Sequence, residues 1–407
     1  MIVFMYPGQG SQKSGMGKLW VDHPSWELVE EASEAADKDV AELLLDADDD
    51  ELAKTYNSQL ATFVLSMVIL DAVTRLGIEA AGHVGHSLGE YSALTSAGVL
   101  NFSDAVALVS ERGNAMQAAA EEREGTMAAV LGLDDDAVLI ACNRTAADVW
   151  VANHNCAGQV VIAGAPEAIN TAISIAKELG AKRSVVLTVG GAFHTPYMAS
   201  ARERLSKALA CAEFRDPIGV VVANVDSMRH ERGVDWPDLL LAQLTSPVRW
   251  RQTLSTLESV GFTTYVEIGP GKVLSGMVKR ELPQRQKLAI STPEDLDGLL
   301  DILVPLSVPV PQSEIAQPQS QVEVSDFPTC EGEHFFAVER LVVSPASGIF
   351  NMGTSVKPGT NVSVGDLIGS VGDVEVRSAF SGELVGVLAL DGERVTDCQP
   401  IAWLRLH

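Results

Sequence analysis

The chain has 407 residues, enough for about two to three domains, of which 46% are hydrophobic and 20% charged. This composition supplies an ample core and excludes wholesale disorder. Acidic residues number 54 and basic residues 29, so the net charge is −25. A chain this acidic repels nucleic acid and anionic lipid, so we expect neither as a partner.

The cysteines and the N-terminal segment indicate the compartment. The five cysteines lie far apart and form no C-x-x-C pair: Cys142, Cys156, Cys211, Cys330 and Cys398. This pattern predicts reduced thiols in the cytoplasm and no metal site. The segment 1–7 lacks a basic stretch and is typical of a buried strand, not a signal peptide. The longest apolar stretch, Leu60 to Leu70, is too short to span a membrane.

The first 300 or so residues alternate strand-like and helix-like segments. We predict strands at Ile2–Tyr6, His83–His86, Gly219–Asn224 and Thr264–Ile268, and helices at Gln59–Leu76 and Leu88–Ala97. This alternation predicts an α/β fold, a parallel sheet with helices on both faces.

A different order occupies residues 126–187. Predicted strands at 126–131, 149–153, 159–163 and 183–187 alternate with predicted helices at 134–145 and 166–179. The resulting order, βαββαβ, is that of a ferredoxin-like unit. We therefore expect a ferredoxin-like subdomain, about residues 126–190, inserted into the larger domain.

The composition changes after residue 303. Pro305, Pro309, Pro311 and Pro318 stand among Ser, Gln and Val, which predicts an extended linker over 304–328. Residues 329–407 should then form a separate domain. Its segment 344–348 recurs as 378–382, shifted by 34 residues, which predicts a C-terminal all-β sandwich with pseudo-twofold symmetry.

The sequence Gly85-His86-Ser87-Leu88-Gly89 is a G-x-S-x-G motif between a predicted strand and a predicted helix. This is the setting of a nucleophile elbow in a hydrolase-like core, in which a strained turn exposes the serine at a helix N-terminus. The amide of Leu88 could then donate to an oxyanion. A chance Gly/Ser turn is the alternative.

Two further residues could complete such a site. A serine nucleophile needs a base, and His194 follows directly after the predicted inserted unit. Arg112 lies on a helix one element beyond the elbow, and its planar guanidinium could pair with a carboxylate. The alternatives are a loop histidine in structural contacts and a solvated helix arginine.

Two glycine-rich segments complete the set of motifs. Gly8-Gln9-Gly10 is no dinucleotide fingerprint, because position 13 is Lys13. The glycine spacing of 269–272 does not fit a P-loop. Both segments are better interpreted as sharp turns at strand ends.

Together these motifs resemble the malonyl-CoA:acyl-carrier-protein transacylase family, from residue 1 to about 295. The matching segments, in the order of the family, are 7–12, 85–91, 112–117, 155–164, 191–194, 223–226, 243–248 and 269–272. The resemblance implies that Ser87 is the acylated nucleophile and His194 its general base. It also implies that the backbone carbonyl of Gln243 orients the histidine and that the amides of Gln9 and Leu88 form the oxyanion hole.

The resemblance also implies the substrate contacts. Arg112 pairs with the free carboxylate of a malonyl group, and Met116, Asn155 and Phe193 line the acyl site. Phe193 before the histidine and Leu88 after the serine leave little room for a 2-methyl group, so methylmalonyl is the less expected substrate. The substrates implied are malonyl-CoA and an acyl carrier protein, with no permanently bound cofactor.

The C-terminal domain resembles biotinyl/lipoyl carrier domains, on the segments 343–348, 356–359, 362–366, 381–382 and 391–395. Those domains carry a modified lysine at a hairpin tip between their halves. Here that stretch, 371–378, has no lysine, and the one lysine after Lys287 is Lys357. We expect a degenerate carrier fold without biotin or lipoate, used for docking or packing. An unrelated β-sandwich or modification at an unexpected site are the alternatives.

The leading hypothesis is an enzyme that loads malonyl onto a carrier protein, in fatty acid or polyketide biosynthesis. A proofreading acyl-thioester hydrolase on the same elbow and a scaffold with a secondary transferase domain are the alternatives. Carrier proteins of this kind are acidic, so docking needs a locally basic surface. The candidate cations are Lys182, Arg183, Lys272, Lys279 and Arg280, with Arg285 and Lys287 nearby in sequence. A solvated helix face is the alternative.

Overall fold

The computed structural model describes residues 1–303 and, with short gaps, 339–406. The chain divides into two compact units, Met1–Val310 and Pro311–His407. The linker predicted at 304–328 lies outside the described residues.

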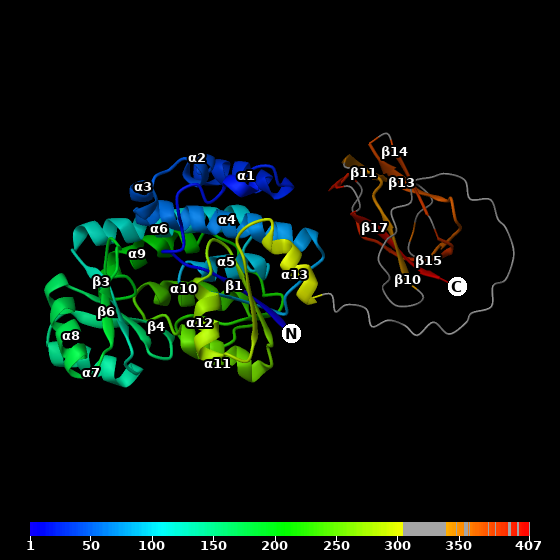
Figure 1. Ribbon diagram of the computed structural model, residues 1–407. Coiled ribbons are helices and arrows are strands. Elements are labelled where there is room, and N and C mark those ends of the chain that lie inside the picture. Colours follow the sequence, from blue (N-terminus) through cyan, green and yellow to red (C-terminus); the bar gives the residue numbers. More distant parts are fainter. Residues whose placement is uncertain are drawn as a thin grey trace. The chain divides into compact units, whose positions relative to one another are not determined.

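A parallel five-stranded sheet organises the first unit (Figure 1). Its order is β7 (Val220–Val221), β2 (Gly82–Gly85), β1 (Ile2–Tyr6), β8 (Thr264–Ile268) and β9 (Gln286–Ile290). Val3 of the central strand pairs with Gly82 on one side and Tyr265 on the other. The apolar β1 sequence fits this place, because a central strand of a parallel sheet is covered on both faces. The predicted parallel α/β sheet is confirmed.

Helices cover both faces of this sheet. Phe4 and Tyr6 belong to one core, whereas Val3 and Met5 point into another, as the alternation of a strand requires. The first core is completed by α1 (Glu27–Ala36), α2 (Val40–Leu45), α3 (Asp49–Ala53), α4 (Thr55–Arg75), α5 (Gly89–Ser96), α6 (Phe102–Glu122), α9 (Ala199–Leu209), α10 (Trp236–Leu244) and α13 (Asp295–Leu303). The second is completed by α11 (Trp250–Val260) and α12 (Val273–Glu281).

Helix α4 is longer than the sequence predicted. It has 21 residues and, by length and composition, is the one described helix that could cross a membrane. However, 83% of its apolar window is buried inside the protein. Its apolar length is therefore that of a core helix, packed against α6.

Strand β7 is shorter than predicted. It spans Val220–Val221, not 219–224. After Val222, which bridges to Arg229, the chain turns back, and the amide of Ala223 donates to the carbonyl of Met228. The local turn therefore takes the hydrogen bonds that a longer strand would have given to the sheet.

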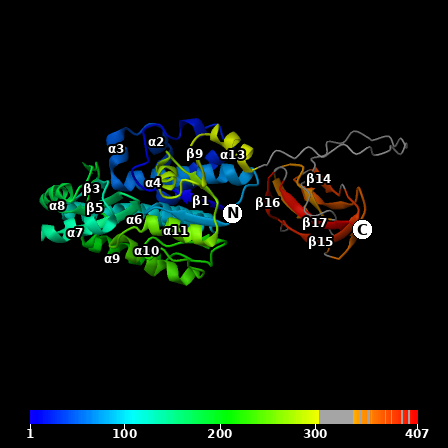
Figure 2. The same cartoon turned by 60° about the horizontal axis from the view of Figure 1, so that its bottom comes forward.

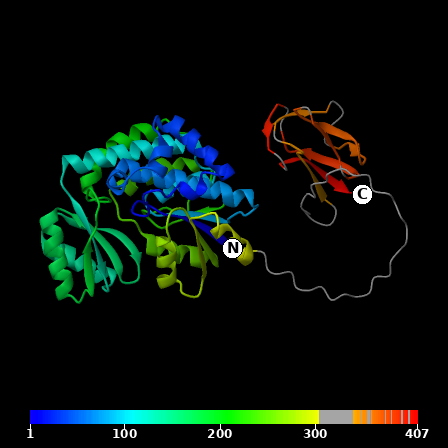
Figure 3. The same ribbon diagram turned by 45° about the horizontal axis from the view of Figure 1, so that its top comes forward.

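An antiparallel four-stranded sheet forms a lobe of its own within the first unit (Figure 3). Its elements follow the order β3 (Thr126–Leu131), α7 (Asp135–Thr145), β4 (Val149–Cys156), β5 (Gln159–Gly164), α8 (Pro166–Glu178) and β6 (Arg183–Val186). The strands are arranged β4-β5-β3-β6. Helices α7 and α8 share an apolar core with this sheet and lie together at one end of the unit (Figures 1 and 2).

The C-terminal unit contains two four-stranded sheets around one apolar core. The first has the order β10 (Glu339–Val343), β17 (Pro400–Leu406), β15 (Gly382–Val387) and β12 (Asn361–Val362). The second has the order β14 (Val374–Arg377), β13 (Leu367–Val371), β11 (Gly348–Met352) and β16 (Arg394–Val395). Each strand of one sheet has a counterpart 33 or 34 residues away in the sequence, and that counterpart belongs to the other sheet.

The repeated serines make the same turn in both halves. Ser344 is buried, and its hydroxyl donates to the carbonyl of Ala346, 2.6 Å away. Ser378 is equally buried and donates to the carbonyl of Phe380 at 2.7 Å. The repeat in the sequence is therefore a repeat of local structure.

Candidate active site

Ser87 lies on a sharp turn between β2, which ends at Gly85, and α5, which begins at Gly89. Its φ of 53° is a left-handed conformation that costs a serine about 1–3 kcal/mol. The two glycines permit the turn. A Cβ on Gly85 would lie 1.8 Å from the carbonyl oxygen of Gly89, and a Cβ on Gly89 would lie 2.0 Å from that of Tyr6.

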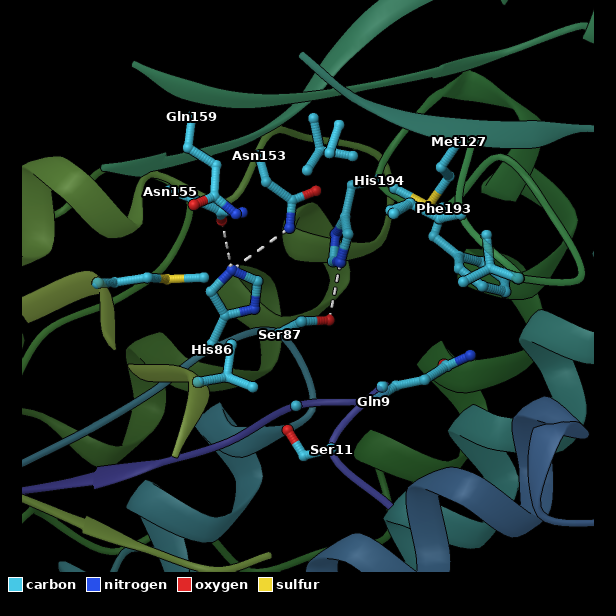
Figure 4. A pocket seen from close by; sticks show the side chains of 18 of the residues that line it. Gln9, Ser11, His86, Ser87, Met127, Asn153, Asn155, Gln159, Phe193 and His194 are labelled. Atoms are coloured by element: carbon cyan, nitrogen blue, oxygen red, sulfur yellow. Dashed lines mark hydrogen bonds between the residues drawn. The ribbon is translucent and has the colours of Figure 1, made fainter. Parts of the chain in front are cut away.

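His194 faces the serine from the segment between β6 and α9 (Figure 4). Its Nε2 lies 2.7 Å from Ser87 Oγ, and its Nδ1 lies 2.8 Å from the backbone carbonyl oxygen of Gln243. A carbonyl only accepts, so Nδ1 carries the proton and Nε2 is the acceptor for the serine hydroxyl. Burial, with a smaller effect from the charge of Arg112, lowers the pKa of His194 to about 3.

Arg112 is fully buried beside this pair, so the alternative of a solvated helix arginine is wrong. Its guanidinium donates to Gln59 Oε1 at 2.5 Å, to Gln243 Oε1 at 2.8 Å and to Ser87 Oγ at 3.1 Å. Burial lowers its pKa. The structure thus holds the guanidinium of Arg112 in a fixed position beside the hydroxyl of Ser87.

A cavity of about 280 Å³ opens at Ser87 and His194, between the main sheet and the inserted lobe. Its polar lining consists of Gln9, Ser11, His86, Ser87, Asn153, Asn155, Gln159 and His194. Its apolar lining includes Met116, Met127, Phe193, Leu274 and Met277. The structure therefore brings the predicted Met116, Asn155 and Phe193 to the lining of one cavity.

The two residues whose backbone amides are expected to form an oxyanion hole both lie at the site. Gln9 lines the cavity, and Leu88 follows the serine directly. Neither amide donates a hydrogen bond within the described part of the chain. The side chain of Leu88 is buried and does not line the cavity, so of the two residues expected to limit the room for a 2-methyl group only Phe193 lies there.

Several contacts were not anticipated from the sequence. His86 Nε2 lies 2.9 Å from Asn155 Oδ1 and 3.3 Å from Asn153 Nδ2, so the residue before the serine ties the elbow to the inserted lobe (Figure 4). Gln59 holds Arg112 from helix α4. Nothing in the local sequence around Gln59 distinguishes it from the other polar residues of that helix.

The predicted docking cations are exposed but do not all gather at one place. Lys182 and Arg280, with Arg251, line a second hollow of about 540 Å³ on the inserted lobe and α12. Arg280 also donates to Gln159 Oε1 at 2.6 Å. Arg183, Lys272 and Lys279 are exposed outside that lining.

Two of the nearby cations are engaged elsewhere. Arg285 pairs with Glu258, and Lys287 donates to the carbonyls of Pro283 and Arg285. Among the described residues, no three His, Cys, Asp or Glu side chains are grouped so as to hold a metal ion.

A serine on a strand-to-helix elbow, a histidine within hydrogen-bond distance of it and an adjoining cavity are the arrangement expected of an α/β enzyme with a nucleophilic serine. The family described as "Acyl transferase domain" matches residues 3–296, and the chain belongs to it.

Relatives and solved structures extend this finding. The malonyl CoA-acyl carrier protein transacylase of Bacillus subtilis is 40% identical over 307 residues, covering 74% of this chain and 97% of that protein. The Escherichia coli K12 enzyme of the same name is 39% identical, covering 74% and 98%. The structure of an acyl carrier protein S-malonyltransferase from Vibrio cholerae matches with a TM-score of 0.71 at 38% identity, covering 73% and 99%.

A fourth match contains a partner. It is the structure of a type II PKS acyl-carrier protein in complex with its malonyl-transacylase. The match has a TM-score of 0.72 at 35% identity and covers 74% of this chain and 99% of that chain. All four matches cover about three quarters of this chain.

Proposed function

We propose that this protein transfers a malonyl group from malonyl-CoA to the phosphopantetheine thiol of an acyl carrier protein through a seryl ester. The observation that carries the proposal is the contact of Ser87 Oγ with both His194 Nε2 and the buried guanidinium of Arg112. Relatives with the name of this activity support it.

In the first half-reaction, Ser87 Oγ attacks the thioester carbonyl as His194 Nε2 takes the hydroxyl proton. The amides of Gln9 and Leu88 stabilise the oxyanion. The C–S bond then breaks, His194 returns the proton to the leaving thiolate, and CoA departs. In the second half-reaction the carrier thiol attacks the seryl ester by the same steps, which gives ping-pong kinetics.

Arg112 selects the acyl group. The malonyl carboxylate pairs with the guanidinium, whereas acetyl leaves a buried cation without that partner. This favours the transferase over the alternative of a proofreading hydrolase, which has less need of a carboxylate clamp. The intact serine–histidine pair likewise argues against a scaffold with a secondary transferase domain.

The acyl carrier protein binds at the exposed cations around the inserted lobe and α12, of which Lys182 and Arg280 line the same hollow. Their positive charge attracts an acidic partner despite the net charge of −25. The reaction serves fatty acid or polyketide biosynthesis in the cytoplasm, where thiols such as the exposed Cys211 stay reduced.

The domain assignments belong to this proposal. The inserted lobe, about residues 126–190, is a ferredoxin-like unit, since its element order and strand order fit that fold. Residues 329–407 form a biotinyl/lipoyl-like domain, since its two sheets repeat one strand order. Lys357 is exposed but lies before β12, away from the β13–β14 hairpin between the halves, and that hairpin has no lysine.

Intact-mass analysis tests the proposed function. The protein is mixed with malonyl-, methylmalonyl- or acetyl-CoA. Malonyl-CoA should add one malonyl group, methylmalonyl-CoA much less, and Ser87→Ala should gain none. His194→Ala should gain it about 10²–10⁴-fold more slowly. A malonyl adduct on Ser87→Ala, or no adduct on the natural protein, would contradict the proposal.

A further inference from the structure

The strained backbone of Ser87 is held by two side chains from other elements. Its amide donates to Asn224 Oδ1 at 2.7 Å, and its carbonyl accepts from Gln243 Nε2 at 2.8 Å. Asn224 also donates to the carbonyl of Gly85 at 2.8 Å. A left-handed serine persists only where the surroundings impose it, and these contacts impose it on both sides of the residue.

Gln243 connects the serine to the other two groups of the site. Its backbone carbonyl accepts from His194, and its side-chain oxygen accepts from Arg112. A guanidinium only donates, so it fixes the amide of Gln243 with the oxygen toward Arg112. The amide nitrogen is thereby directed at two acceptors, the carbonyl of Ser87 and Glu90 Oε2.

Glu90 joins Gln243 and Asn224. It lies on α5, one turn beyond the serine, and its side chain is fully buried. Its Oε1 accepts from the backbone amide of Asn224 at 2.7 Å, and its Oε2 accepts from Gln243 Nε2 at 2.5 Å. Burial raises the pKa of Glu90 to about 8, while these two donors and the charge of Arg112 act in the opposite direction.

A buried carboxyl group is costly unless it is fully hydrogen-bonded, so its presence needs a reason. Glu90 does not line the cavity and hydrogen-bonds neither the hydroxyl of Ser87 nor the imidazole of His194. The described partners of its side chain are instead the two residues that hold the reacting groups, while its backbone amide donates to the carbonyl of Ser87 at 3.1 Å.

We propose that Glu90 is a positioning residue, which holds Asn224 and Gln243 and, through them, the backbone of Ser87, the imidazole of His194 and the guanidinium of Arg112. The inference rests on the proposed function. It assigns to Glu90 an effect on both the acylation rate and the preference for a carboxylate-bearing acyl group, without contact with substrate.

The test compares acylation rates of Glu90→Gln at saturating malonyl-CoA and acetyl-CoA. The variant keeps the side-chain shape but turns an NH₂ group toward one of the two N–H donors. Misplacement of reacting groups by a fraction of an ångström should lower both rate constants by about 10- to 100-fold. The malonyl-to-acetyl ratio should also fall, because Arg112 is held by the same amide.

A double-mutant cycle separates positioning from a general structural effect. Gln243→Met removes the connecting amide. The factor by which Glu90→Gln lowers the acylation rate should therefore be at least about 3-fold smaller in that background than in the natural protein. Equal factors in the two backgrounds, or an unchanged rate in folded Glu90→Gln, would overturn the inference. Acylation of the natural protein, measured alongside, tests the proposed function separately.

Stability has its own control. Leu44 is buried on α2, and no residue of that helix lines the active-site cavity. Leu44→Ala should therefore leave a void in the core and lower the melting temperature without changing the acylation rate. If Glu90→Gln does not fold, Glu90→Asp keeps the carboxyl group but cannot reach both donors. It should show the same loss of rate, and a natural rate in that variant would also overturn the inference.

Discussion

At the scale of single residues, the site uses a backbone carbonyl where many serine enzymes place a carboxylate. The carbonyl of Gln243 fixes the tautomer of His194 but adds no negative charge. Burial therefore dominates and keeps the imidazole neutral. A thioester is readily attacked, so a serine–histidine pair without a buried aspartate is sufficient.

The pH dependence of acylation follows from this burial. An unshifted histidine would lose its basic form below pH 6.5, whereas a pKa of about 3 keeps His194 neutral there. The acylation rate with a malonyl-N-acetylcysteamine thioester, which lacks the phosphates of CoA, should stay level between about pH 5 and 7. An inflection near 6.5 in rapid-quench measurements would contradict the shift.

The same lowered pKa that preserves the basic form of His194 should make the folded protein less stable at low pH. The unfolded chain binds a proton at His194 below its ordinary pKa of 6.5, while the folded chain does not. Folding stability should therefore decline as the pH falls below that value. The rate measurements thus need a parallel check by circular dichroism that the protein is folded at each pH.

Replacing Arg112 should change the choice of acyl group. In Arg112→Ala, the transition state for malonyl-CoA should lose about 2–4 kcal/mol of stabilisation, because a charged partner of the carboxylate is lost. The value of kcat/KM for malonyl-CoA should fall accordingly. Acetyl-CoA has no carboxylate and serves as the internal control. Equal losses for the two substrates would show that Arg112 only holds Gln59, Gln243 and Ser87 in place.

At the scale of elements, helix α12 serves two surfaces. Val273, Leu274 and Met277 line the cavity, while Lys279 and Arg280 are exposed. Buried Glu267 fixes the start of the helix, accepting from the amide of Leu274 at 3.0 Å. Moving this helix would therefore alter the cavity and the surface proposed for the carrier protein together.

Charge reversal tests the carrier surface. Arg280 also holds Gln159 of the cavity, so the cleaner pair is Lys182→Glu with Lys279→Glu. This double variant should raise KM for the carrier protein several-fold, because an acidic partner meets two new negative charges. KM for the malonyl-N-acetylcysteamine thioester should not change.

The matched control makes the same change of charge elsewhere. Arg202 and Lys207 are exposed on α9, which contributes no residue to the cavity. Arg202→Glu with Lys207→Glu should leave carrier kinetics unchanged. If both double variants raise KM equally, net charge and not a defined patch explains the effect.

At the scale of the whole molecule, the two compact units have separate cores. The match with the acyl transferase family ends at residue 296, and the cavity lies within the first unit. Truncation after Leu303 should therefore leave acylation of Ser87 within a few-fold of the full chain, as measured by intact mass over time. Loss of acylation in a truncated protein that still folds would show that the second unit takes part in the reaction.

The C-terminal unit should carry no biotin or lipoate. A ligase must reach a lysine at the hairpin tip between the halves, and the described strands β13 and β14 pair there without one. Peptide mass spectrometry of protein from its natural host should show unmodified Lys357. Biotin or lipoate on that residue would overturn the degenerate reading of this domain.

The sequence alone determined the order of elements within residues 126–187 and the identity of the elbow. Strand β3 lies where the pattern predicted it, because a short apolar run between polar segments is typical of a strand that is buried on both faces. The glycines around Ser87 signal the turn, since no side chain fits at either position. The motif order was also sufficient to indicate the family that residues 3–296 match.

Only the tertiary structure decided how polar residues are connected. Ser87 with Glu90, Arg112, Asn224 and Gln243 come from four separate segments, and no local pattern records which of them hydrogen-bond. The length of β7 likewise depends on a turn formed farther along the chain. Local propensity and periodicity act over a few residues, whereas a buried polar network is fixed by where packing brings distant segments together.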